Sequence, residues 1–493
     1  MDAYPSHAEM MFKLGVLRRL LLGVGALAAG GVAALRCGPD WRLRASSDDA
    51  GDVARATSPG ARAPTAPAAS ATPPQQARTA PPATTPPPVS EEEQREFMLA
   101  SARSAWAYVQ RNYHAATGFV GATDQYQFVT MWDVGSILGA FLAARELGFI
   151  TPDDYRTRVA RVLRSLEGAA LHDGAAFNRL YAAASGRMVG RDHLPTRRGY
   201  GWSATDLGRL LLWLKIVATH DSEYEAAGRR IVARLDIDRI VRDGYLRGEE
   251  LTPRGRRRLF QEGRIGYEQY AAAGFALWDI RADRALDLHA NSAPATVLGH
   301  AVLADRRGDD LLTSEPIVML GLELGWPSTE WERLARAVLA AQEERHRRTG
   351  LVTIVSEDAV PRPPAYFYYY LLLHNGQEFA VVTPSHDLVP WNLRWVSAKA
   401  AFAWHALLPS AYTWLALQTV KAAESPNVGW SAGVYERSKI RVPSNNLNTA
   451  AVILESAAYF MRGCPLIITY ASCPTAAGGG AAQPGASGQG VPW

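Results

Sequence analysis

The stretch TMWDVGSIL, Thr130 to Leu138, places a tryptophan and an aspartate at the start of a segment otherwise suited to a buried helix. The stretch SATDLGRLL, Ser203 to Leu211, repeats its pattern Asp-x-Gly-x-[Ile/Leu]-Leu, with Trp202 directly ahead. In both copies a Thr or Ser stands three residues before the aspartate, which is the spacing of a helix N-cap. Gly135 and Gly208 permit neighbouring helices to approach closely. The repeat therefore predicts two helices that begin in the same way.

Helical periodicity dominates from Glu91 onward, and β-branched alternation is confined to about Val352 to Val382. We expect helices over segments separated by short returns, which pack as antiparallel hairpins. They are Glu91–Arg111, Met131–Leu147, Pro152–Glu167, Ala204–Ala218, Ser222–Leu235, Gly266–Leu286, Ala293–Ala304, Glu315–Leu324, Thr329–His346, Leu393–Leu407, Ala411–Ala423 and Asn446–Met461.

Alternate members of this series differ in character. The second, fourth and sixth are rich in Ala, Gly and Leu on several faces, whereas the third, the fifth and EWERLARAVLAAQEERHRR have a charged face. The first kind suits an inner layer and the second an outer layer. Six such hairpins close into an all-α toroid with a small β insertion. The long loops before the inner helices then meet on one face, where we expect the site.

The segments GFVGATDQYQFVTMWDVGSILGAFLAARELG, QEGRIGYEQYAAAGFALWD, TGLVTIVSED and NNLNTAAVILESAAYF resemble a bacterial domain-of-unknown-function family. Its members are exported and similar to glucoamylase-like, six-hairpin glycosidases. The resemblance covers nearly the whole body, about Glu91 to Tyr470. It implies the toroid fold and, by analogy of fold alone, glycosidase activity, mostly with inversion.

The first ninety residues have a different organisation. Basic residues precede the apolar run Leu20 to Leu35, so residues 1–36 are expected to be an uncleaved membrane anchor, with a cleaved signal as the alternative. Residues 37–90 are rich in Ala, Pro and Thr and read as a disordered linker. This order predicts a body in the periplasm, anchored to the inner membrane, or secreted if the segment is cleaved.

The C-terminal end and the overall charge add two expectations. Cys464 and Cys473 in RGCPLIITYASCP are predicted to form a disulfide, with two free thiols as the alternative, and residues 471–493 are expected to be a flexible tail. The net charge of +4 is small and the basic residues are scattered, so no nucleic-acid partner is indicated.

Asp133 and Asp206 each have two interpretations. Either carboxylate suits a first-turn cap, where negative charge favours the helix dipole. A cap alone does not call for Trp132 and Trp202, however. An indole beside a carboxylate suits a sugar, whose C–H face stacks while its hydroxyls bond the acid.

The stretch QEGRIGYEQY places Glu262, Arg264, Tyr267 and Glu268 around the start of a helix. Flanking glycines indicate a turn that presents side chains into a site. Glu268 is early enough in the helix to serve only its dipole. Glu262 has no such role, so we predict it to be the general acid.

Four further residues complete the predicted site. Glu357 in VSEDAV is, with Asp133, a candidate base. Tyr368 in AYFYYY suits sugar stacking or core β packing, and Glu436 in GVYERS is a site acid or a solvated loop acid. Asp124, in the loop ahead of TMWDVGSIL, is assigned to substrate binding.

The favoured function is an exported glycoside hydrolase that acts on a bacterial glucan or exopolysaccharide through paired carboxylates. The alternative is a non-catalytic glycan-binding or envelope assembly protein on the same fold, and a polysaccharide lyase comes third. The sequence has no metal-type Cys/His spacing, no Gly-x-Ser-x-Gly elbow and no phosphate loop, so no metal or cofactor is expected. His193, His374 and His386 are isolated and are read as loop or packing residues.

Overall fold

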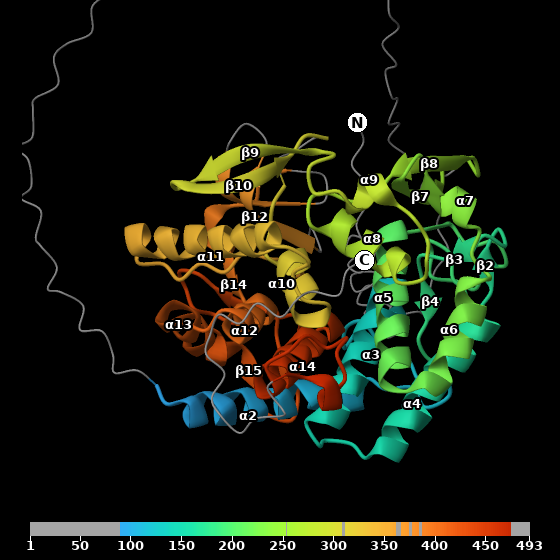
Figure 1. The fold of residues 1–493 in the computed structure, drawn as a ribbon, viewed down its shortest axis with the longest axis horizontal. Helices are drawn as coiled ribbons and strands as arrows, with labels where there is room; N and C mark the ends of the chain where they lie inside the picture. Colours follow the sequence, from blue (N-terminus) through green and yellow to red (C-terminus); the bar gives the residue numbers. More distant parts are fainter. Residues whose placement is uncertain are drawn as a thin grey trace, which may run out of the picture. The chain divides into compact units, whose positions relative to one another are not determined.

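Apolar helices form a closed inner ring in the computed structural model (Figure 1). Each contacts the next in chain order, and the last packs against the first, which closes the ring. In order they are α3 (Met131–Glu146), α5 (Ala204–His220), α8 (Tyr267–Ala276), α10 (Glu315–Glu323), α12 (Ala398–Leu407) and α14 (Leu447–Arg462). In α3, every residue from Met131 to Ala144 except Trp132 is buried. The all-round apolar composition therefore places these helices inside, as predicted.

Helices with one exposed face, which carries charged residues in every case except α13, lie outside the ring. The pairs α4 with α3, α6 with α5, α13 with α12 and α2 with α14 are in contact. Outer helices are α2 (Glu91–Arg111), α4 (Pro152–Gly168), α6 (Glu225–Val232), α11 (Thr329–Thr349) and α13 (Ala411–Val420). This alternation of outer and inner helices confirms the mainly helical toroid.

The structure describes residues 89–252, 254–307, 311–360, 366–373, 377–383 and 387–474, all within one compact unit. The expected anchor and linker, His374, His386 and the tail beyond residue 474 lie outside the described residues. Within these residues, no helix is long and apolar enough to span a membrane.

The sector between α8 and α10 differs from the expected hairpin. Residues 293–304 do not form a helix, and that prediction was wrong. They belong to the antiparallel hairpin of β9 (Ser292–Val297) and β10 (His300–Asp305). Leu298 and Gly299 both have positive φ, as a tight two-residue hairpin turn requires, and Pro294 lacks the N–H that a helix interior needs. The expected helix Gly266–Leu286 is also interrupted, and its end is the short α9 (Asp283–Leu286).

Short sheets occupy the long loops ahead of the inner helices. The expected β insertion is the sheet of β11 (Glu357–Ala359), β12 (Tyr366–Leu373) and β13 (Gln377–Val382), in that order. A second sheet joins β5 (Gly201–Trp202), β6 (Val241–Arg242), β7 (Tyr245–Leu251) and β8 (Arg257–Gln261). Before α12, β14 (Trp395–Ser397) replaces the expected first turns of that helix and pairs with β17 (Gly433–Tyr435).

Glycines set the distance between inner helices α5 and α8. A Cβ on Gly274 would lie 1.9 Å from the carbonyl oxygen of Gly208, and one on Gly208 would lie 2.5 Å from Ala271. Likewise, a Cβ on Gly135 would lie 2.8 Å from Cγ of Arg209. The expectation that Gly135 and Gly208 permit close helix approach is confirmed.

The two ends of the described chain lie together. Arg95 in α2 donates a hydrogen bond of 3.1 Å to the carbonyl of Met461 near the end of α14. Beyond α14, Cys464 and Cys473 form the predicted disulfide, and both are buried. Packing against the ring therefore extends to Cys473, slightly past the expected start of the tail.

Candidate functional site

The loops that precede the inner helices meet at one end of the ring, which we call the mouth. Arg264, ahead of α8, donates to Glu357 over 2.5 Å, and Asn446, ahead of α14, donates to Asp358 over 2.8 Å. The first turns of the inner helices bring polar side chains to the mouth, namely Asp133, Asp206, Tyr267, Glu315, Lys399 and Asn448. The mouth therefore gathers carboxyl, hydroxyl, amide and cationic groups from around the whole ring.

Asp206 and Glu262 form a carboxyl pair on one side of the mouth. Glu262 follows β8, accepts a hydrogen bond from the backbone N–H of Ala204 and lies 3.5 Å from Nη2 of Arg179. Burial and the negative charge of Glu262 raise the pKa of Asp206 to about 7. Asp206 is thus a carboxyl group that is half protonated at neutral pH.

Asp133 takes part in a helix cap together with Thr130, which was one of its two predicted roles. Its carboxylate accepts from both the N–H and the hydroxyl of Thr130, each over 2.9 Å, and the Thr130 hydroxyl accepts from the N–H of Asp133. Its negative charge also contributes to the raised pKa of Asp206, after burial and the charge of Glu262. The cap therefore also belongs to the acidic side of the mouth.

Trp132 is partly exposed beside this cap. Its ring lies 5.8 Å from the ring of Tyr267 and 5.0 Å from the guanidinium carbon of Arg209. The indole is therefore held between α8 and α5, and part of its surface remains at the mouth.

A second polar cluster lies on the side of the mouth formed by α10, α12 and α14. Glu315 accepts from Lys399 over 2.7 Å and from Asn448 over 2.6 Å. Asp358 lies 3.7 Å from the Lys399 ammonium, and burial raises the pKa of Asp358 to about 7. In the ring order, α12 stands opposite α5, so this cluster lies across the mouth from Asp206.

Sequence reasoning missed this cluster apart from the neighbouring Glu357. Its members come from four separate segments, and no local spacing connects them. A lysine at the start of the apolar run AKAAFAWHAL was the available signal, because a buried lysine requires a carboxylate partner.

Several buried polar atoms at the mouth have no hydrogen-bond partner within the described residues. They are the Tyr267 hydroxyl, Asn448 Oδ1, Asp358 Oδ2, Arg264 Nε and Arg179 Nη2. Buried polar groups are nearly always satisfied in native proteins, by protein, water or ligand. Unsatisfied donors and acceptors gathered at one end of the ring suit a ligand rich in hydroxyl groups.

Arg209 lies beneath the mouth and links five inner helices. It donates to Glu323 over 2.7 Å, to Tyr270 over 2.5 Å and to Ser136 over 3.3 Å, and lies 3.5 Å from Glu455. All five side chains are buried. In the repeated motif, Arg209 of the second copy stands where the first copy has Ser136. The two copies therefore differ at a position that belongs to this network.

Trp202 does not reach the mouth, and its assignment to substrate binding was wrong. Strand β5 pairs with β7, so the indole is fully buried and donates to the carbonyl of Arg247 over 2.9 Å. His172 and Arg239 cover its ring. A buried indole has no face to offer a sugar.

Two predicted site acids belong to buried ion pairs. Glu268 is fully buried and pairs with Arg307, and Gln261 donates to it over 3.0 Å. Glu436 forms a two-pronged pair with Arg345, at 2.9 and 3.0 Å. A buried carboxylate neutralised in this way is structural, so neither residue is placed to bind a sugar.

The remaining predicted residues lie around the mouth. Arg264 bridges Glu357 and the ring of Tyr267, which is 4.7 Å from its guanidinium carbon. Tyr368 stacks on Tyr370 in a small β cluster and is mostly buried. Asp124 pairs with Arg111 over 2.7 Å at the outer edge. Of this group, Arg264 and Tyr267 themselves carry unsatisfied buried atoms.

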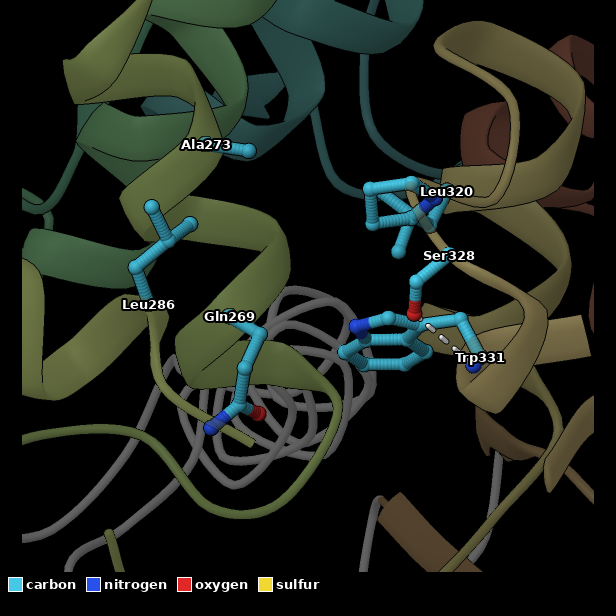
Figure 2. Close-up of a pocket in the computed structure, with 7 residues that line it drawn as sticks. Gln269, Ala273, Leu286, Leu320, Ser328 and Trp331 are labelled. Atoms are coloured by element: carbon cyan, nitrogen blue, oxygen red, sulfur yellow. Dashed lines mark hydrogen bonds between the residues drawn. The ribbon is translucent and has the colours of Figure 1, made fainter. Parts of the chain in front are cut away.

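A cavity of about 230 Å³ opens elsewhere, in the wall between α8 and α10 (Figure 2). Mainly apolar side chains line it, including Leu286, Leu320 and Trp331, with Gln269 as the longest polar one. It coincides with the sector where a β hairpin and the short α9 stand in place of an outer helix. None of its lining residues belongs to the site at the mouth.

Solved structures share this fold at low sequence identity. The chain is similar to a putative glucoamylase from Bacteroides caccae ATCC 43185, with a TM-score of 0.55, 15% identity and coverage of 77% of this chain and 95% of that one. It is also similar to an endo-β-1,2-glucanase from Chitinophaga pinensis in complex with sophorotriose and glucose, with a TM-score of 0.55, 13% identity and coverage of 78% and 96%. For an endo-β-1,2-glucanase from Talaromyces funiculosus the values are 0.52, 11%, 75% and 86%. These similarities establish the α/α toroid fold of glucan-active glycosidases.

A search of curated protein sequences found no match. The family model for the protein of unknown function DUF3131 matches residues 100–463, which span every helix of the inner ring. The chain therefore belongs to the DUF3131 family.

Proposed function

We propose that this protein is a glycoside hydrolase that cleaves a glucan or related bacterial polysaccharide at the mouth of the ring. The observation that carries the proposal is the pair of Asp206 and Glu262. A glycosidase needs one protonated carboxyl group to donate to the leaving oxygen and a second carboxylate to activate water or attack the sugar. The two members of this pair have different surroundings, as those two roles require.

Asp206 is suited to be the proton donor. Its pKa of about 7, raised by burial and by the charge of Glu262, keeps a transferable proton on it at neutral pH. As the leaving oxygen departs, that proton moves to it and leaves a carboxylate on Asp206. A neighbouring carboxylate is what raises the pKa in paired-acid sites.

Glu262 is suited to be the second carboxylate, which differs from the expectation that it is the acid. The Ala204 N–H and Arg179 both offer hydrogens or positive charge to its oxygens. Such partners orient a carboxylate toward one face of a bound sugar. Inversion, which the family resemblance implies, requires the carboxyl groups to be about 6.5–9.5 Å apart when the water is in place.

Sugar binding is supported by the remaining groups at the mouth. The exposed part of Trp132 offers a stacking surface, and Tyr267 and Asn448 offer unsatisfied hydrogen-bonding atoms. Two of the similar structures are β-1,2-glucanases, so β-1,2-glucan is the first substrate to test. A periplasmic location, with the inner membrane bound through the N-terminal segment, is part of the same proposal.

The test is release of reducing ends from β-1,2-, β-1,3- and β-1,4-glucans and bacterial exopolysaccharides. Asp206→Asn keeps the shape of the side chain but removes the proton, so turnover should fall by about 10²–10⁴-fold. Asp154→Asn is the matched control, because Asp154 follows the cap residue Thr151 at the same spacing on the outer helix α4. Its turnover should not change.

Two results would contradict the proposal. Full activity of Asp206→Asn on a cleaved substrate would remove Asp206 as the donor. Binding of a glycan that no preparation cleaves would favour the non-catalytic alternative, and Trp132→Ala should then weaken that binding.

A further inference from the structure

An apolar patch with a cationic rim stands out on the surface of the described chain. Leu388, Trp391 and Ile440 are 58%, 54% and 65% exposed, which is unusual for side chains of this size. Arg437 and Lys439 are exposed beside them. We call these five residues the Trp391 patch.

Two loops from distant parts of the sequence build this patch as one surface. The N–H of Glu436 donates to the carbonyl of Arg394 over 2.9 Å, just beyond the pairing of β14 with β17. The guanidinium carbon of Arg437 lies 3.8 Å from the centre of the Trp391 ring. A cation stacked on an indole stabilises that placement of the two side chains. The patch is therefore ordered by contacts between the loops.

The Trp391 patch combines large exposed apolar side chains with exposed cationic side chains. Trp391 and Ile440 are exposed on two loops that contact each other, Leu388 is exposed three residues before Trp391, and large exposed apolar side chains mark a binding surface. Its two loop tips are residues 387–394 and 437–443. Their exposed charged side chains are one acidic residue, Asp387, and two basic residues, Arg437 and Lys439. The partner should therefore present apolar groups beneath a negatively charged layer.

We propose that the Trp391 patch docks on the surface of a bilayer that contains anionic phospholipids. Tryptophan favours the interface between headgroups and acyl chains, and leucine and isoleucine favour the acyl chains. Arginine and lysine bind phosphate groups, and their stems extend back along the apolar surface. A soluble polysaccharide offers phosphate or carboxylate groups in some cases but no acyl chain to cover Leu388 and Ile440, so the bilayer fits better.

The position of the patch gives this contact a consequence for the mouth. Both loops precede inner helices, α12 and α14, so the patch lies at the same end of the ring as Asp206. Docking through it holds the mouth close to the lipid surface. This contact is separate from the expected N-terminal anchor, and it is independent of whether the mouth hydrolyses a glycan.

The test uses residues 89–474, which contain the whole closed ring with its disulfide and exclude the apolar N-terminal run. Co-sedimentation is measured with vesicles of about 30% phosphatidylglycerol in phosphatidylcholine and with pure phosphatidylcholine vesicles. The protein should bind the vesicles that contain phosphatidylglycerol. Its affinity for pure phosphatidylcholine vesicles should be at least about tenfold lower. Trp391→Ser with Ile440→Ser should lower binding to the anionic vesicles about tenfold or more.

Matched controls come from the outer layer. Leu415 on α13 is 40% exposed, and Arg333 is exposed on α11, so Leu415→Ser and Arg333→Gln change the same kinds of residue away from the patch. Both should bind vesicles as the unchanged protein does. Circular dichroism melts check that the patch variants stay folded, and Arg437→Gln with Lys439→Gln tests the cations without altering the apolar residues.

Three outcomes would overturn the proposal. The first is equal binding to anionic and neutral vesicles, and the second is unchanged binding by the patch variants. The third is a dimer in solution that Ile440→Ser dissociates, since the patch would then be covered by a second copy of the chain.

Discussion

The protonation of Asp206 connects the chemistry of the mouth to the stability of the fold. Burial and Glu262 hold the pKa of Asp206 near 7, whereas an aspartate in an unfolded chain has a pKa of about 3.9. Between these values the folded state binds more protons than the unfolded state. The free energy of unfolding therefore falls as pH rises from about 4 to about 7, and this loss is complete above pH 7.

We predict that Asp206→Asn raises the free energy of unfolding more at pH 8 than at pH 5. Removing a charge that the folded state disfavours should add about 1–3 kcal/mol at pH 8 and much less at pH 5. Urea unfolding of residues 89–474 at the two pH values measures this. Asp154→Asn, on an exposed helix start, should show no such pH dependence, and an equal effect for both variants would contradict the prediction.

Local spacing led to three predicted residues that the structure places together at the mouth. Asp133 and Asp206 were selected because helix caps repeat in the sequence, and Glu262 because it stands beside a predicted glycine turn and has no role at the helix start. Glu315, Lys399 and Asp358 were missed, because long-range loop contacts create that cluster. Trp202 was misplaced, because pairing between β5 and β7 decides its burial and leaves no trace in the local sequence.

Among the elements, α5 and α8 approach each other closely because glycines stand at their contact. We predict that Gly208→Ala destabilises the protein by about 2–4 kcal/mol, because the added methyl group would collide with the backbone and side chain of Ala271. Gly168→Ala at the end of α4 is the control. Nothing lies within 4 Å of a Cβ there, so the change should be within about 0.5 kcal/mol. Thermal unfolding compares them, and similar melting temperatures would show that the helices separate easily.

Helix type and order were predictable because long apolar segments have a clear period, and α2 was predicted with its observed bounds. The hairpin of β9 and β10 was not, because its alternation of small residues also fits a helix. The turn at Leu298 and Gly299 was the overlooked signal. The breaks before α9 and α12 depend on tertiary contacts that override a continuous apolar pattern.

For the whole molecule, the Arg209 network holds the inner ring together at its axis. We predict that Arg209→Met lowers the free energy of unfolding by about 3–5 kcal/mol, because Glu323 and Glu455 then lose their cation while fully buried. The triple variant Arg209→Met, Glu323→Leu, Glu455→Leu should recover part of this loss. Chemical denaturation of both proteins is the measurement. A loss in the triple variant as large as in Arg209→Met would show that the hydrogen-bond geometry, and not the unpaired charge, matters.

The contact between Arg95 and Met461 joins the first long helix of the described chain to the last one. These two helices, α2 and α14, lie against each other. The tight turn at Leu298 and Gly299 is far in sequence from both α2 and α14. It lies in the sector between α8 and α10, which lacks a full outer helix. A circularly permuted gene that opens there and joins the old ends would preserve every helix pair of the ring. Such a permuted chain should fold to the same ring, because the order of the helices along the chain would change while their contacts stay the same.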